Sequence, residues 1–162
     1  MITDNDVFRS HGAVPRSSLD AFERQFGICL PESYKSLIAR YNWLQPHKNI
    51  FDFVEANGKP NDLDISFYGF DSQTYPGSKT IAYYQPPDEA TPDDIIIFGY
   101  CGNGDSVFFD YRPDKSSTNP PVGLMYHDDF RDISPGIWER TTIRLAHDFD
   151  SFMSILREDS DN

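Results

Sequence analysis

Hydrophobic residues near the start of the chain repeat at the spacing of an amphipathic helix. In residues 17–27 the apolar positions fall at i, i+3 and i+7, on one helical face: Leu19, Phe22 and Phe26. Ser17 or Ser18 can cap the start of this helix, and Gly27 can end it in the left-handed conformation. The pattern therefore predicts a first helix that buries one aromatic-rich face.

A second helix is predicted over residues 30–42, directly after the first. Pro31 suits its first turn, and Glu32 complements the positive end of the helix dipole. Its apolar face is formed by Tyr34, Leu37, Ile38 and Tyr41. Because the linking segment is so short, we expect Ile28 and Leu30 to fill the corner between two packed helices.

From Trp43 onward, short alternating runs separated by turn residues indicate strands. Residues 49–54 and 62–70 alternate apolar and polar side chains, and the second run would place three residues on one face: Leu63, Ile65 and Phe67. Residues 71–94 are rich in proline, tyrosine and acidic residues, which indicates irregular surface with a short strand at 80–85. Three consecutive isoleucines in residues 94–100 predict a central strand that is buried on both faces.

The chain ends with two more predicted strands and a helix. The strands are expected at residues 106–111 and 121–129, and the helix within residues 147–159, capped by Asp148. The apolar stripe of this helix consists of Phe149, Phe152, Met153 and Leu156. Helices, then strands, then a helix predict one α+β domain over residues 1–162.

A glycine-rich loop between two of these strands raises the question of a nucleotide or thiol site. The segment Phe98–Tyr111 reads FGYCGNGDSVFFDY, but a phosphate cradle needs a helix after its glycines and this loop is followed by strand residues. Asn103 and Gly104 between two hydrophobic runs instead predict a hairpin. Cys101 as a nucleophile would need a base, and His127 could approach it only if its strand is adjacent.

Metal-ligand residue types lie close together in only two segments. These contain His127, Asp128, Asp129, His147 and Asp148. Neighbouring residues of a strand point to opposite faces, so the first three cannot converge on one ion without a bend. We therefore predict no metal, no cofactor and no catalytic residue, and the chain is not expected to be an enzyme.

The net charge of the chain is the property that most restricts the classes of possible partner. Among 162 residues, 26 acidic side chains oppose 14 basic ones, which leaves a net charge of −12 at pH 7. Binding of nucleic acid is driven by Lys and Arg, so a nucleic-acid partner is not expected. A basic protein would be attracted, although many acidic proteins owe their charge to solubility alone.

Cysteine usage and hydropathy indicate a compartment. Cys29 and Cys101 lie far apart and outside any paired spacing, which fits a reduced cytoplasm better than a disulfide scaffold. No continuous apolar run approaches the roughly 18 residues of a membrane span, so no membrane association is expected.

Acidic residues in the middle of the chain, with aromatic residues among them, are the candidates for a binding face. The predicted partner-binding residues are Asp88, Glu89, Asp93, Asp94, Asp128 and Asp129. The interleaved aromatic residues are Trp43, Tyr68, Tyr75, Tyr83 and Tyr84. Tyrosine and tryptophan surrounded by charges are common at protein interfaces, although such residues are also often half-buried for structural reasons.

The order of these elements resembles the SUKH superfamily of bacterial immunity proteins, which also includes a fungal regulator of cell-wall synthesis. The resemblance is carried by LDAFERQFGICLPESYKSLIARYN, by IIIFGYCGNGDSVFFDY and by AHDFDSFMSIL, which together span about residues 17–157. Residues 43–94 match little, and Trp43 stands where the family usually has a glycine.

The resemblance implies a single α+β domain with a mainly antiparallel sheet, flanked by two N-terminal helices and a C-terminal helix. It implies that this domain acts without catalysis and that it binds and neutralises a cognate bacterial toxin, often a nuclease, in the cytoplasm. The alternative within the same resemblance is an intracellular regulatory scaffold without a toxin partner. A hydrolase that uses Cys101 or the His-Asp segments is a third hypothesis. We assign Leu30, Pro31, Tyr34, Gly104 and Phe149 to the fold.

Overall fold

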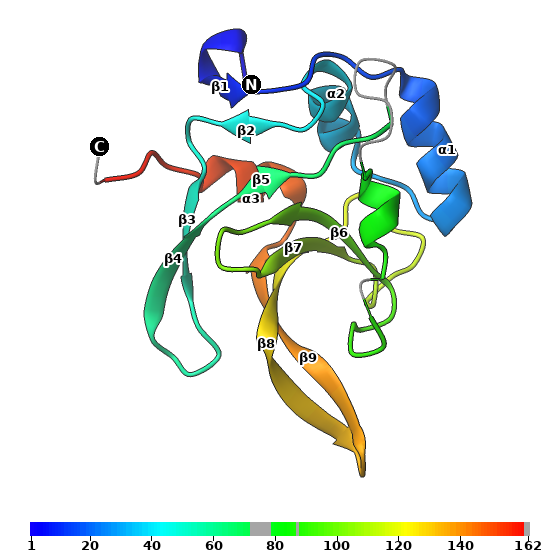
Figure 1. Cartoon of the computed structure of the whole chain (residues 1–162), viewed down its shortest axis with the longest axis vertical. Helices are drawn as coiled ribbons and strands as arrows, with labels where there is room; N and C mark the ends of the chain where they lie inside the picture. The colour runs from blue at the N-terminus through cyan, green and yellow to red at the C-terminus, as the bar shows by residue number, and fades with distance from the viewer. Residues whose placement is uncertain (72–78, 87, 161–162) are drawn as a thin grey trace.

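A computed structural model describes residues 1–71, 79–86 and 88–160, and it has the α+β fold that the sequence predicts (Figure 1). The helices are α1 (Arg16–Phe26), α2 (Glu32–Arg40) and α3 (Phe149–Ser154), with 3-10 turns η1 (Asp4–Asp6) and η2 (Ile81–Tyr84). The strands are β1 (Val7–Arg9), β2 (Gln45–Pro46), β3 (Ile50–Val54), β4 (Pro60–Asp64), β5 (Ser66–Phe67), β6 (Ile95–Tyr100), β7 (Ser106–Asp110), β8 (Val122–Ser134) and β9 (Ile137–Ala146).

The described strands form three antiparallel sheets. The main sheet has five strands in the order β5-β6-β7-β8-β9, while β1 pairs with β2 and β3 pairs with β4. Strand β6 is an interior strand that is buried along almost its whole length, as three consecutive isoleucines predict, and β7 occupies the middle position. Because β6 carries apolar side chains on both faces of the sheet, other side chains have to pack over each face.

The three helices supply the core on one face of the main sheet. Alternate residues of β6 and β7 point to this face, among them Ile96, Phe98 and Phe109. They join the apolar faces of the helices, formed by Leu19, Phe22, Tyr34, Ile38, Phe149 and Phe152. On the opposite face a smaller cluster consists of Ile95, Ile97, Phe108 and Met125, with Tyr68 packed against it.

The predicted helices are present, with one correction to their caps. Gly27 ends α1 in the left-handed conformation at φ 65°, and the Asp148 carboxylate caps α3 by accepting a hydrogen bond from the Ser151 N–H at 2.7 Å. The prediction that Ser17 or Ser18 caps α1 is wrong, because the helix begins at Arg16 and its N-cap position is Pro15. Within the described residues, no helix combines the length and the apolar character that crossing a bilayer requires.

Two strand predictions in the middle of the chain are wrong. Residues 62–70 do not form one strand, because Ile65 separates β4 from β5 and donates its N–H to the Asn49 carbonyl, so the chain leaves β3 there and joins β6. Residues 81–84 form the 3-10 turn η2 in place of a strand. Its local hydrogen bond from Tyr83 N–H to the Thr80 carbonyl replaces pairing with a sheet edge.

The loop between β6 and β7 is the hairpin that its sequence predicts. The Cys101 N–H donates to the Asp105 carbonyl at 2.9 Å, and the Gly104 N–H donates to the Cys101 carbonyl at 3.1 Å. Gly104 has φ 100°, a conformation that residues with a Cβ rarely adopt. A strand and not a helix follows the glycines, so the geometry of a helix-based phosphate cradle is absent from this described segment.

The longest strands of the protein were not fully predicted. Strand β8 continues beyond residue 129 to Ser134, turns, and returns as β9, which the sequence analysis did not identify. Strand β7 pairs with β8 only over residues 122–125, whereas β9 pairs with β8 as far as Ser134. The β8–β9 hairpin therefore extends away from the body of the molecule (Figure 1), and we call residues 126–141 the arm.

Candidate partner-binding surface

The six acidic residues predicted for the binding face are all exposed, but they lie in two groups. Asp128 and Asp129 lie on β8 where the arm begins. Asp88 lies in the loop between η2 and β6 and contacts the arm from there. Asp93 and Asp94 lie just before β6, where both line a cavity that is described below. Among the described residues, no hydrogen bond or ion pair joins these two groups, and Glu89 follows Asp88 in the loop.

Arg140 on β9 joins the loop that carries Asp88 to the base of the arm. Its guanidinium is hydrogen-bonded and ion-paired with the Asp88 carboxylate, and its Nε donates to the His127 carbonyl at 3.2 Å. The Arg140 N–H donates to the Ala90 carbonyl at 2.8 Å, so the loop also pairs with the outer edge of β9. The hydrogen bond from Arg140 lowers the pKa of Asp88, which keeps this carboxylate ionised.

Asp105 fixes the other side of the arm base. It is a buried carboxylate that accepts hydrogen bonds from the His127 N–H at 2.9 Å and from Asn103 Nδ2 at 2.9 Å. The Nδ1 atom of His127 lies 2.7 Å from the same carboxylate. The hydrogen-bonded Asp105 raises the pKa of His127 above its ordinary value. The glycine hairpin is thus tied to the first residues of the arm.

This contact predicts a pH effect that NMR can measure. We expect the His127 ring to titrate above its ordinary pKa of about 6.5, with a smaller elevation in an Asp105→Asn variant. Because folding raises this pKa, protonated His127 stabilises the folded state below about pH 6.5, and the contribution is lost as the pH rises through the folded-state pKa. An unchanged His127 titration curve in Asp105→Asn would contradict the assignment.

Asp93 and Asp94 belong to a separate region near the C-terminal end of α1. Asp94 has a positive φ of 58° and its carboxylate lies 3.1 Å from Lys115 Nζ. Both residues line a cavity of about 360 Å³ that also includes Tyr111 and Lys115. Their place in one continuous binding face with the arm thus remains a prediction.

Aromatic side chains cluster on the face of the sheet opposite the helices. The ring centroids of Tyr68 and Tyr84 lie 4.0 Å apart, and those of Tyr68 and Tyr100 lie 4.8 Å apart. Trp43 contacts Tyr68 edge-on. Burial among these rings raises the pKa of Tyr68 to about 12. Four predicted interface aromatics, Trp43, Tyr68, Tyr83 and Tyr84, lie in or beside this cluster, while Tyr75 is outside the described residues.

The thiol of Cys101 is in the wrong environment for a nucleophile. Burial, with Asp64 and Asp105 nearby, raises its pKa, so the thiolate is disfavoured. The Nδ1 atom of His127 lies 2.7 Å from the Asp105 carboxylate, so this imidazole nitrogen is engaged by Asp105 and is not directed to the thiol. Within the described part of the chain there is also no group of three or more His, Cys, Asp or Glu side chains that could hold a metal ion.

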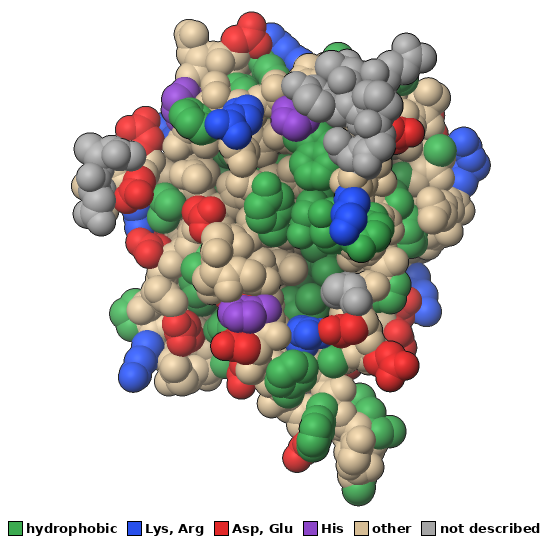
Figure 2. Space-filling model, viewed as in Figure 1, with side chains coloured by type: hydrophobic (Ala, Val, Ile, Leu, Met, Phe, Trp, Pro, Cys, Tyr) green, Lys and Arg blue, Asp and Glu red, His purple; other side chains and the backbone are tan. Residues whose placement is uncertain are grey.

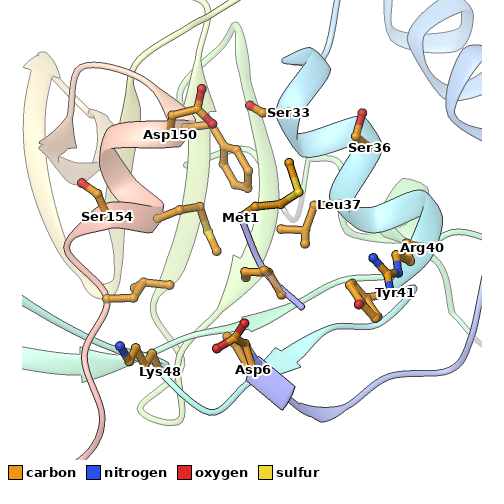
Figure 3. Close-up of a pocket in the computed structure, with 15 residues that line it drawn as sticks. Met1, Asp6, Ser33, Ser36, Leu37, Arg40, Tyr41, Lys48, Asp150 and Ser154 are labelled. Atoms are coloured by element: carbon orange, nitrogen blue, oxygen red, sulfur yellow. The ribbon is translucent and has the colours of Figure 1, made fainter. Parts of the chain in front are cut away.

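A cavity of about 640 Å³ lies between α2, α3 and the N-terminal segment (Figure 3). Leu37 and Met153 contribute apolar surface, while Arg40 and Asp150 place charges of both signs at its rim. Arg40 is itself paired with Asp4 at 2.8 Å. With both signs present, the cavity favours neither an anionic nor a cationic ligand.

The exposed apolar side chains of the arm were not predicted from the sequence. Phe130, Ile133, Ile137 and Trp138 lie within residues 130–138 of the arm, and we call this part the arm tip. Figure 2 shows hydrophobic side chains on the projection at the bottom of the view. The Pro135-Gly136 pair was the available signal, because a proline-glycine step between two runs with strand-forming residues marks a turn. Gly136 has φ 77°, as such a turn requires.

Comparison with known proteins agrees with the order of elements. The model of the family described as SMI1 / KNR4 family (SUKH-1) matches residues 14–155, from just before α1 to the end of α3. No curated protein and no solved structure matches the chain. The match includes both N-terminal helices, the whole main sheet and the C-terminal helix, and the chain therefore belongs to the SMI1 / KNR4 family (SUKH-1).

Proposed function

We propose that this protein is a cytoplasmic immunity protein that binds a cognate toxin, of the nuclease type, and neutralises it by occlusion. Family membership supports a role in protein binding. The observation that carries the proposal is the set of exposed carboxylates at the base of the arm, on a chain of net charge −12. Asp88, Glu89, Asp128 and Asp129 form the proposed centre of this surface, and Asp93 and Asp94 its proposed extension.

The proposed mechanism is electrostatic steering followed by coverage of the toxin's active site. An enzyme that cleaves nucleic acid needs a basic groove, because its substrate carries one negative charge per nucleotide. Carboxylates on the immunity protein would be attracted to that groove, and complementary fields raise encounter rates by about 10- to 1,000-fold at low salt. An interface of the standard size of about 1,600 Å² would then exclude the substrate.

Co-expression with a candidate toxin, sought among the genes adjacent to this one, tests this function. We expect the protein to restore growth of cells that produce the toxin, and to bind the purified toxin domain directly. We further expect the association rate to fall at least about tenfold as salt rises from about 50 to about 500 mM, because exposed charges are screened. Failure to rescue growth together with failure to bind the toxin domain would refute the proposed function.

A regulatory scaffold is the alternative function within the same family resemblance. Such a protein would bind host proteins, and its loss would change the host in the absence of any toxin. Deletion of the gene in a strain that also lacks the candidate toxin separates the two. An unaltered strain supports the immunity function, whereas a growth or cell-wall defect supports the scaffold.

A further inference from the structure

The arm is a two-stranded ribbon that leaves the protein core. Within the described part of the chain, β8 beyond Met125 has only β9 as a strand partner, and the ribbon projects away from the helices (Figure 1). An isolated two-stranded ribbon is marginally stable in water. Among the described residues, the contacts that hold the base of the arm include Asp105 with His127, Asp88 with Arg140, the Arg140 N–H with the Ala90 carbonyl, and the Ala56 N–H with the Tyr126 hydroxyl. The structure thus holds the arm firmly at one end and presents the other to solvent.

The arm tip concentrates apolar surface where it cannot contribute to the core. Of the nine large hydrophobic side chains that are exposed among the described residues, four lie in the arm tip. Their exposed fractions are 47% for Phe130, 53% for Ile133, 55% for Ile137 and 63% for Trp138. Exposed apolar side chains that are concentrated in one projecting element indicate an interaction site, whereas isolated ones need no explanation. Ile137 and Trp138 are adjacent on β9 and point to opposite faces, so the ribbon presents apolar surface on both faces.

The charges around the arm tip indicate the chemistry of the partner. Arg131 is paired with Glu139 at 2.6 Å, and Arg140 is paired with Asp88, so both arginines of the arm are neutralised within the chain. The carboxylates of Asp129 and Asp132 have no ion-pair partner among the described residues. The Asp128 carboxylate lies 3.7 Å from Nε2 of His127, which is longer than a hydrogen bond. The arm therefore presents apolar side chains bordered by available negative charge.

These charges argue against two other occupants of the arm tip. A second copy of this chain would bring together two molecules that each carry a net charge of −12, which opposes association. A membrane surface in the cytoplasm is anionic and would repel the aspartates that border the tip. A protein with a basic rim and an apolar floor complements both features.

We propose that the arm inserts into a basic, apolar-floored cleft of the partner, with Trp138 and Ile137 as the buried anchors. This inference rests on the proposed function and assigns the arm as the element that enters the toxin's groove. Clefts that hold single-stranded nucleic acid combine basic walls with apolar or aromatic surfaces on which bases stack. The aspartates of the arm occupy the basic walls, and the arm-tip side chains cover the stacking surface.

Matched double variants test this assignment. The tip variant carries Ile137→Thr and Trp138→Thr, and the control variant carries Val54→Thr and Ile155→Thr, which remove two exposed apolar side chains outside the arm. Threonine retains strand propensity, so the arm is expected to stay folded, and circular dichroism melting checks this. The probe is a catalytically inactive domain of the candidate toxin that co-expression identifies. We expect the tip variant to bind at least about 100-fold more weakly, and the control to bind within about threefold of the wild type.

A charge variant tests the aspartates separately. Asp128→Asn, Asp129→Asn and Asp132→Asn together are expected to slow association about tenfold at low salt and to flatten its salt dependence. If the wild type binds the toxin domain and the tip variant binds equally well, the inference is wrong while the proposed function stands. If the wild type neither binds nor rescues growth, both fail. A wild-type dimer that the tip variant converts to a monomer, or tip-dependent binding to phosphatidylserine-containing vesicles, would also overturn the inference.

Discussion

Replacing Tyr34 with alanine is expected to lower the free energy of unfolding by about 3–5 kcal/mol, the range for deleting a large buried aromatic side chain. Tyr34 on α2 is fully buried at the centre of the main core. Its ring contacts three others edge-on, at centroid distances of 5.6 Å to Phe98, 5.1 Å to Phe109 and 5.4 Å to Phe149. One side chain thus links the second helix, two strands and the last helix.

Urea denaturation measures this effect, and Tyr34→Phe is its control. The Tyr34 hydroxyl has no hydrogen-bond partner among the described residues, so phenylalanine keeps the ring contacts and loses no bond within them. We expect the phenylalanine variant to stay within about 1 kcal/mol of the wild type. An alanine variant with near wild-type stability would show that the ring cluster does not hold the helices to the sheet.

Replacing Asp105 with alanine is expected to cost about 2–4 kcal/mol, because it leaves several donors without their charged acceptor. The carboxylate is almost fully buried and accepts from the His127 N–H and from Asn103 Nδ2, with His127 Nδ1 also within hydrogen-bond distance. These contacts join the β6–β7 hairpin to the first residues of the arm. The variant should therefore lose stability and also loosen the arm base.

Two controls make the Asp105 experiment specific. Asp105→Asn retains one carbonyl acceptor and is expected to lose less stability than the alanine variant. Asp128→Ala removes a neighbouring exposed carboxylate and is expected to change the free energy of unfolding by less than about 0.5 kcal/mol. Amide hydrogen exchange of residues 127–141 measures the arm directly. Equal exchange rates in Asp105→Ala and Asp128→Ala would contradict the anchoring role.

The two faces of the main sheet divide structural and proposed functional roles. The helices cover one face and supply the aromatic core, in which Tyr34 and Phe149 have the structural place expected of them. The other face carries the tyrosine cluster around Tyr68, and β8 and β9 of the same sheet continue into the arm (Figure 1). The proposed partner would therefore approach surfaces that the three helices leave uncovered.

The fold class and the helices could be predicted because their signals are local. Apolar spacing within residues 17–27 and 30–42, a glycine stop and an aspartate cap each depend on a few neighbouring residues. The three isoleucines of β6 and the Asn103-Gly104 turn are equally local. Residues 81–84 failed as a strand because strand formation needs a partner edge, which alternation within one segment cannot reveal.

The candidate binding residues likewise combine features that local sequence predicts with features that depend on distant partners. Their acidic character and exposure follow from composition, since carboxylates are rarely buried without partners. The pairing of Asp88 with Arg140 joins residues that are 52 positions apart, and the contact of Asp105 with His127 spans 22. Such pairings depend on which strands become neighbours, so no local pattern predicts them.

By itself, the sequence determined the acidic charge, the amphipathic helices, the buried strand with its glycine turn, and the family to which these belong, because each depends on composition or on near neighbours along the chain. Only the tertiary structure decided that β8 extends beyond its pairing with β7 and that β9 pairs with this extension outside the core. It also decided that four apolar side chains remain exposed there: Phe130, Ile133, Ile137 and Trp138. An apolar side chain on a strand is buried or exposed according to what packs over it, and that is settled only when distant segments meet.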